Sequence, residues 1–303
     1  MKTFSKPLLC ISLIASCLVP RSGAAQEFIL REATTTIQQP HNLEAYWKED
    51  FIEINLYEIT TTGASEKAEA ILIYSRSTFP PDIPVLKGDL ILPSSGMDDP
   101  AHTEVWTPLD YPAHPATRRV KMHWDSEKET TETQLQIRGR EMEIVVSKAG
   151  QTDTTLLPAT YLEDDVRNRI RFDPGTLPLG KIQMVPSLSR IPDSSDFPGI
   201  HEAVANLFIK VKDDAGKQEE TYNYHLNYPQ LGISLMIECE STFPYRILKF
   251  VEMRKHTDKS QSYTSTAVVK NHVYRLAPET KEEWEALWES FGVQNPPDLR
   301  KMR

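Results

Sequence analysis

Three histidines and three aspartates lie in or just after one proline-rich stretch of the chain, from Pro93 to Pro115. They are His102, His114, His123, Asp98, Asp99 and Asp110. Imidazole nitrogens and carboxylate oxygens are ligands for zinc, and the same groups serve as acids and bases in hydrolysis. None of the eight histidines, however, forms a short pair such as His-x-Glu-x-His on one strand. We therefore interpret the stretch as the longest loop of the chain, carrying polar side chains, and assign no metal and no cofactor.

A run of three acids, Glu163-Asp164-Asp165, is the second group that could do chemistry. Carboxylates at close spacing bind calcium when glycines punctuate the loop that presents them. No such glycines are present here. We interpret the run as solvated or helix-capping acids, beside one or two helical turns between Leu162 and Asn168.

Cys239 is the cysteine that lies in the body of the chain, since Cys10 and Cys17 fall near its start. A period of two places Ile233, Leu235 and Cys239 on one face of an expected strand. This pattern favours a buried core thiol over a catalytic one. The body of the chain then has no intrachain disulfide.

Familiar catalytic signatures are missing from the sequence. It contains no Gly-x-Ser-x-Gly, no phosphate-binding P-loop and no dinucleotide-binding glycine motif. Catalytic residues therefore stay unknown, and an enzyme is the less favoured interpretation.

The first 25 residues have the organisation of a signal peptide. Lys2 and Lys6 are followed by an apolar run from Pro7 to Val19, and the small residues 23–25 precede Gln26. The run is shorter than the about 20 apolar residues that span a bilayer. We expect export to the periplasm, with cleavage before Gln26.

Residues 14–17, Ile-Ala-Ser-Cys, also resemble a bacterial lipobox. In that alternative Cys17 is acylated and becomes the first residue of the mature protein. The chain would then be anchored to the cell envelope by lipid, its only contact with a membrane. Both alternatives remain open.

The charge of the chain argues against nucleic-acid binding. Removal of residues 1–25 takes away three basic and no acidic residues, so the formal net charge moves from −9 to −12. Acidic chains repel phosphate backbones, and we find no basic stripe.

Alternating apolar residues recur along residues 26–303 and predict a single β-rich domain. Phe51–Ile59 and Lys67–Arg76 are expected to form a hairpin around Gly63. Further strands are expected at 89–92, 120–124, 131–137, 141–147, 182–185, 205–211, 219–228, 233–240, 245–252 and 263–270. Successive strands at this spacing predict an antiparallel sandwich or a partly closed barrel.

One amphipathic helix is predicted near the C-terminus, over about 278–291. Trp284, Leu287, Trp288 and Phe291 recur at helical spacing, and Gly292 follows as a stop signal. The stripe is expected to pack on the sheet. The alternative is a docking face for another protein.

Short segments along 45–275 resemble an uncharacterised family of exported bacterial proteins. They are Ala45-Tyr46-Trp47, Ile83-Pro84-Val85-Leu86-Lys87, Leu177-Pro178-Leu179-Gly180, Val185-Pro186-Ser187 and Phe243-Pro244-Tyr245-Arg246-Ile247-Leu248. Members are often lipoproteins and are sometimes labelled "septum formation inhibitor Maf". Many carry a Trp-Cys-Gly-His stretch near the middle. Residues 128–133 here hold neither cysteine nor histidine, so no thiol or imidazole chemistry follows from the resemblance.

The Maf label implies a nucleotide pyrophosphatase with a Ser-x-Ser-x-Arg-Arg phosphate loop. The nearest match is Ser75-Arg76-Ser77, which lacks paired arginines. Two function classes remain. One is an exported non-enzymatic protein that binds an apolar ligand or an envelope protein. The other is an envelope-acting hydrolase whose carboxylates come from distant strands.

Overall fold

The computed structural model describes residues 28–32, 42–92, 101–111, 116–126, 129–189, 199–214, 217–255 and 262–293. The predicted signal peptide, Cys17, His114, Asp98 and Asp99 lie outside these residues. Export, lipidation and the extent of the domain therefore stay predictions.

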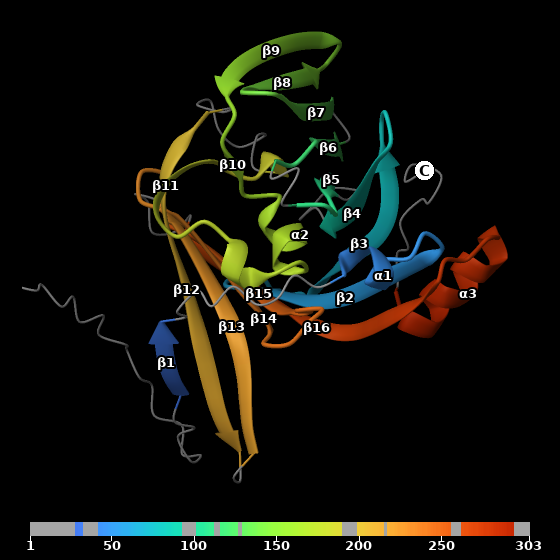
Figure 1. Cartoon of the computed structure of the whole chain (residues 1–303), viewed down its shortest axis with the longest axis vertical. Coiled ribbons are helices and arrows are strands. Elements are labelled where there is room, and N and C mark those ends of the chain that lie inside the picture. The colour runs from blue at the N-terminus through green and yellow to red at the C-terminus, as the bar shows by residue number, and fades with distance from the viewer. Residues whose placement is uncertain are drawn as a thin grey trace, which may run out of the picture.

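The described strands form one sheet that is not closed (Figure 1). They are Phe28–Glu32 (β1), Phe51–Thr61 (β2), Ala68–Phe79 (β3), Ile83–Leu92 (β4), Ala101–Pro108 (β5), Arg119–Ser126 (β6), Glu129–Arg138 (β7), Glu141–Lys148 (β8), Gln151–Pro158 (β9), Tyr161–Leu162 (β10), Gly180–Val185 (β11), His201–Asp214 (β12), Lys217–Tyr228 (β13), Ile233–Glu240 (β14), Ile247–Arg254 (β15) and Tyr263–Leu276 (β16). The mainly β class is confirmed. A single sheet matches the partly closed barrel more nearly than the sandwich.

The order across the sheet follows the chain with one break. It runs from β10 through β16, then β2 through β9, and β1 pairs with β12 outside this path. Strand β16 joins the two ends of the sequence by pairing with β2. Among the described pairings only β10–β11 is parallel. Most connections are therefore hairpins, as at β2–β3, where the predicted hairpin is confirmed.

The predicted loop from Pro93 to Pro115 is wrong over residues 101–108, which form β5. Thr103, Val105 and Thr107 are all buried on one face of this strand. Two of the three are threonines, so the buried face does not stand out by hydropathy, although β-branched residues favour strands. Strands β1 and β9 were also not expected from the sequence.

The sheet curls around a short helix, α2 (Val166–Ile170), as Figure 1 shows. Residues of α2 and of the following turn η1 (Pro174–Thr176) lie beside the largest apolar cluster, which includes Val166, Ile170, Leu177, Tyr57 and Tyr224. A four-residue helix, α1 (Leu43–Tyr46), leads into Trp47 of the same cluster. We call the side of the sheet that faces α2 the concave face.

The C-terminal helix α3 (Lys281–Phe291) covers the opposite face of the sheet. Leu287, Trp288 and Phe291 pack against Ile52, Ile54, Leu56, Ile71, Ile73 and Ile91. The predicted packing on the sheet is confirmed. The predicted start near Pro278 is too early, because Thr280 is the N-cap and forms a capping box with Glu283.

One further prediction concerns the burial of Cys239. Cys239 is 1% exposed on the inward face of β14, so the core thiol is confirmed, and burial raises the pKa of this thiol. Among the helices of the described ranges, none is long and apolar enough to cross a membrane.

Candidate functional site

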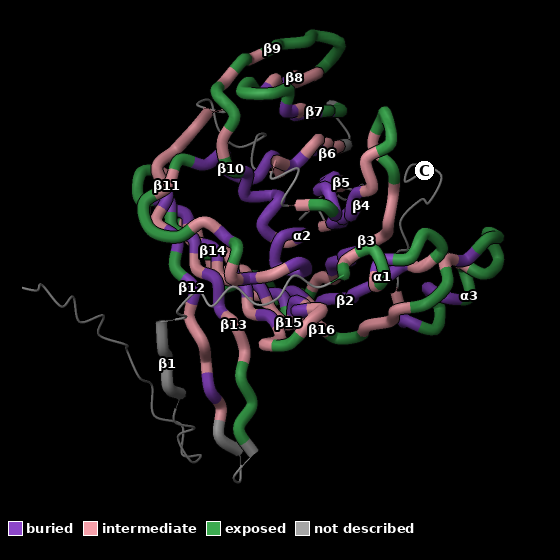
Figure 2. The backbone as a smooth tube through the Cα atoms, viewed as in Figure 1, coloured by how far each residue is buried: buried purple, intermediate pink, exposed green. Residues whose placement is uncertain are grey.

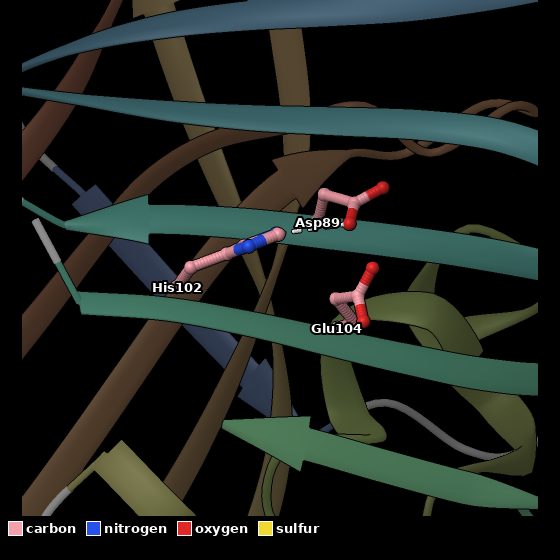
Figure 3. A group of neighbouring side chains, drawn as sticks. All are labelled: Asp89, His102 and Glu104. Carbon is pink, nitrogen blue, oxygen red and sulfur yellow. Dashed lines mark hydrogen bonds and ion pairs between the residues drawn. The ribbon is translucent and has the colours of Figure 1, made fainter. Parts of the chain in front are cut away.

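Four titratable side chains meet on the outer face of β4 and β5, next to the patch that α3 covers. We call Lys87, Asp89, His102 and Glu104 the outer cluster. Asp89 lies directly opposite Glu104 across the two strands, and His102 is two residues before Glu104 on β5. Figure 3 shows the imidazole of His102 pointing toward the carboxylate of Asp89 on β4, and Glu104 on the same strand as His102, β5. Period-two alternation thus brings these side chains to one surface.

One hydrogen bond and two ion pairs connect the four members of the outer cluster. His102 Nε2 lies 3.0 Å from Asp89 Oδ1. Lys87 Nζ lies 3.2 Å from the same oxygen and 2.6 Å from Glu104 Oε1. The side chains are between 5% and 16% exposed, so water screens these contacts only partly.

The outer cluster contains the donor atoms of a metal site. One atom each from Asp89, His102 and Glu104 lie within 4.8 Å of one another. An imidazole with two carboxylates suits zinc and similar divalent ions. Of these three residues, only His102 was among the candidates that the sequence indicated.

Lys87 already supplies a positive charge at this place. Burial opposes its charge, but Asp89 and Glu104 outweigh burial and raise the pKa of Lys87 above its ordinary value. The ammonium compensates both carboxylates, so a metal ion would have to displace it. The same contacts do not favour the hydrolase alternative, because its carboxylates must be free to face a substrate.

The structure brings together only part of the predicted histidine group. His102 and His123 are direct neighbours across β5 and β6. His123 Nδ1 lies 3.4 Å from Glu132 Oε1 on β7. Asp110 lies beyond Pro108, the last residue of β5, and Pro108 is about 20 Å from His102 at strand spacing.

Sequence reasoning missed Asp89 and Glu104. Both lie in alternating runs, Lys-Gly-Asp on β4 and His-Thr-Glu on β5. Recognition of β5 as a strand would have shown that His102 and Glu104 share a face. The pairing of β5 with β4, however, depends on the connection between them, which carries no hairpin signal of its own.

A second polar group fills the concave face. We call Leu162–Phe172 the plug segment; it includes α2 and is buried except for the half-buried Arg167. The acid run lies at its start, so the solvated alternative is wrong. Asp165 is at the N-cap position of α2, as the helix-capping alternative expects, but its side chain makes no capping hydrogen bond. Glu163, Asp164 and Asp165 are 1%, 3% and 4% exposed. A hydrophilic run gives no sequence signal of burial, because its partners lie far away in the chain.

The three acids hold the plug segment to its surroundings. Asp164 accepts hydrogen bonds from Ser187 Oγ and from Leu188 N at 2.8 Å. Burial raises the pKa of Asp164, while these hydrogen bonds act in the opposite direction. Asp165 accepts from Thr107 Oγ1 on β5 and pairs with Arg169 Nε at 2.8 Å.

Asn168 connects the plug segment to two strands at once. Its Nδ2 lies within hydrogen-bond distance of Leu86 O at 3.1 Å, Val105 O at 3.2 Å and Thr107 Oγ1 at 3.0 Å. An amide nitrogen has two hydrogens to donate, so the three acceptors share them. The contacts fix the depth of α2 above β4 and β5.

Arg171 is the most deeply buried charge of the plug segment. It is 0% exposed and its Nη2 donates to Glu53 Oε2 on β2. The guanidinium carbon lies 5.5 Å from the ring centre of Trp47 and 5.3 Å from that of Tyr74. Burial opposes the charge, but Glu53 and the neighbouring tyrosines together outweigh burial and raise the pKa of Arg171. Such a pair positions a segment more than it stabilises the fold.

These contacts define the class of protein: an open, curled β-sheet whose concave face is occupied by its own chain. No family model and no curated protein matches the chain. Among solved structures, it is similar to a crystal structure described as a β-barrel-like protein of a domain of unknown function, DUF1849, from Brucella abortus. The TM-score is 0.45 at 7% identity, over 75% of this chain and 98% of that one.

Proposed function

We propose that the chain is an exported, non-enzymatic protein of the cell envelope that acts by binding another protein. One observation carries the proposal: the plug segment occupies the concave face, where a curled sheet would otherwise receive an apolar ligand. Hydrogen bonds and ion pairs from the plug segment reach β2, β4 and β5, so this segment is part of the core. Binding then falls to the outer surface and to the edges of the sheet.

The acidic side chains add support for a non-enzymatic role. The two carboxylates of the outer cluster share Lys87, and Asp165 and Glu53 are paired with Arg169 and Arg171. Carboxylates that are engaged by neighbouring cations in this way are not free to face a substrate.

Export is the second part of the proposal and rests on residues 1–25. The mature protein is expected to begin at Gln26, or at an acylated Cys17. Mass spectrometry of the protein isolated from its native envelope distinguishes the two. An intact Met1 in a cytosolic fraction would contradict export.

A combined extraction and cross-linking experiment tests the binding proposal. The protein is purified from its native envelope and extracted with organic solvent. A photo-reactive residue is placed at Val268 or Leu276, which are exposed on β16. The expected result is a discrete protein adduct at one position and no stoichiometric lipid. One lipid molecule per chain, with no protein adduct at any position, would overturn the proposal in favour of an apolar ligand.

A further inference from the structure

Strand β9 forms an open edge of the sheet. It is the last strand of the path and pairs with β8 on one side, and no strand in the described part of the chain pairs with its other side. Most of the strand is exposed, and Figure 2 shows this as a green stretch. Leu156 is 65% exposed.

The register of β8 and β9 shows which backbone groups face the open side. Ala149 and Gly150 form a two-residue turn, with φ values of 49° and 79°. The flanking residues Lys148 and Gln151 are then a hydrogen-bonded pair, and such pairs recur at every second position. Ala159 N donates to Arg140 O at 2.8 Å. This pair lies eight positions from Lys148 and Gln151 on each strand, an even number, as the alternation requires. The N–H and C=O groups of Thr152, Thr154 and Leu156 therefore point away from β8.

The edge lacks the usual protection against pairing. Exposed edge strands commonly carry lysines, a bulge or an internal proline. Between Gln151 and Leu157 the strand has no lysine and no proline, and its one charged residue is Asp153. Its register with β8 has no bulge. Thr152, Thr154 and Thr155 are β-branched residues that suit an extended strand.

We propose that β9 pairs antiparallel with β9 of a second copy of this chain, about a two-fold axis at Thr154. In this register Thr154 faces Thr154 of the second copy, and Thr152 faces Leu156. All three outward N–H groups and all three outward C=O groups are then used. Cross-strand threonine pairs are favourable. The dimer is independent of the protein partner proposed above.

Charge and hydrogen bonding select this register over its neighbours. An axis at Asp153 would set two carboxylates directly opposite each other, which is unfavourable. An axis at Thr155 would place Pro158, which has no N–H, opposite Thr152. The axis at Thr154 places Asp153 opposite Thr155. The contact is small, so the dimer is expected to be weak and to depend on protein concentration.

Cysteine cross-linking tests the register directly. Residues in a hydrogen-bonded antiparallel pair have Cα atoms about 5.5 Å apart, within the range that a disulfide bridges. Thr154→Cys is therefore expected to form a disulfide-linked dimer on mild oxidation. Thr152→Cys is the matched control, because position 152 is also exposed and on the same face as position 154. In the proposed register it faces Leu156 of the second copy, so the two copies of position 152 are four residues apart along the strand. Cys239 is buried and should not react.

Light scattering across a range of concentrations supplies the second measurement. The mature wild-type chain should pass from monomer to dimer as its concentration rises. Thr154→Pro removes one outward N–H and is expected to weaken association by about tenfold or more without altering the thermal melt. Thr154→Val keeps the N–H and should associate as the wild type does. A wild type that is monomeric at every concentration, or equal cross-linking of Thr154→Cys and Thr152→Cys, would overturn the proposal.

Discussion

Asn168 of the plug segment lies directly over Gly88 of β4, in space that only a glycine leaves free. A Cβ atom at position 88 would collide with Asn168 Oδ1 and lie 3.3 Å from Tyr74 Cε1. The side-chain nitrogen of Asn168 meanwhile contacts backbone oxygens of β4 and β5. Gly88 therefore leaves the space that the Asn168 side chain occupies, and the hydrogen bonds of Asn168 hold α2 against the sheet.

Gly88→Ala is predicted to lower the free energy of unfolding by about 1–3 kcal/mol, because Asn168 cannot move aside without losing buried hydrogen bonds. Urea unfolding measures the change. In the Asn168→Ala background the collision is absent, so Gly88→Ala should cost clearly less there. Equal costs in both backgrounds would mean that the two residues do not act on each other.

The buried pair of Glu53 and Arg171 gives the second prediction. Arg171→Met leaves the carboxylate of Glu53 buried without its cation, and should cost about 3–5 kcal/mol of unfolding free energy. The double variant Glu53→Met with Arg171→Met removes both charges, and should be more stable than the Arg171→Met single variant. A loss below about 1 kcal/mol in that single variant would show that water reaches Glu53.

Period-two alternation was a reliable guide wherever one face of a strand was apolar. It identified the β2–β3 hairpin and the inward face of β14 with Cys239. It failed where buried residues are polar, as for Thr103 and Thr107 on β5. It failed again for Glu163, Asp164 and Asp165, whose partners Thr107, Ser187 and Leu188 lie 23 or more residues away in the chain. Both candidate clusters depend on such distant pairings, so local sequence patterns could not reveal them.

Removal of Lys87 is predicted to convert the outer cluster into a metal site. Lys87→Met leaves two carboxylates and an imidazole close together without the ammonium, and should bind Zn²⁺ at least about tenfold more tightly than the wild type. Isothermal titration calorimetry measures both affinities. A further His102→Ala substitution should abolish the gain. Equal affinities in Lys87→Met and the wild type would show that Lys87 does not compete with the ion.

The C-terminal helix gives the fourth prediction. Trp288 is 3% exposed against β2 and β3, so Trp288→Ala should cost about 3–5 kcal/mol of unfolding free energy. Trp284 on the preceding turn is only partly buried, and Trp284→Ala should cost less. If both substitutions left the thermal melt unshifted, α3 would be a docking helix that the fold does not require.

Hydrogen exchange across the plug segment tests most directly whether the concave face is permanently occupied by the chain itself. The amides of Val166, Arg169 and Arg171 donate within the segment, to Glu163 O, Asp165 O and Asn168 O. We predict that they exchange as slowly as the amides of Leu72 and Ile73 in the central strand β3, because the plug segment can open only when the sheet unfolds. Fast exchange of the plug segment while β3 stays protected would show that the segment leaves the concave face in the folded protein, and would make room there for an apolar ligand.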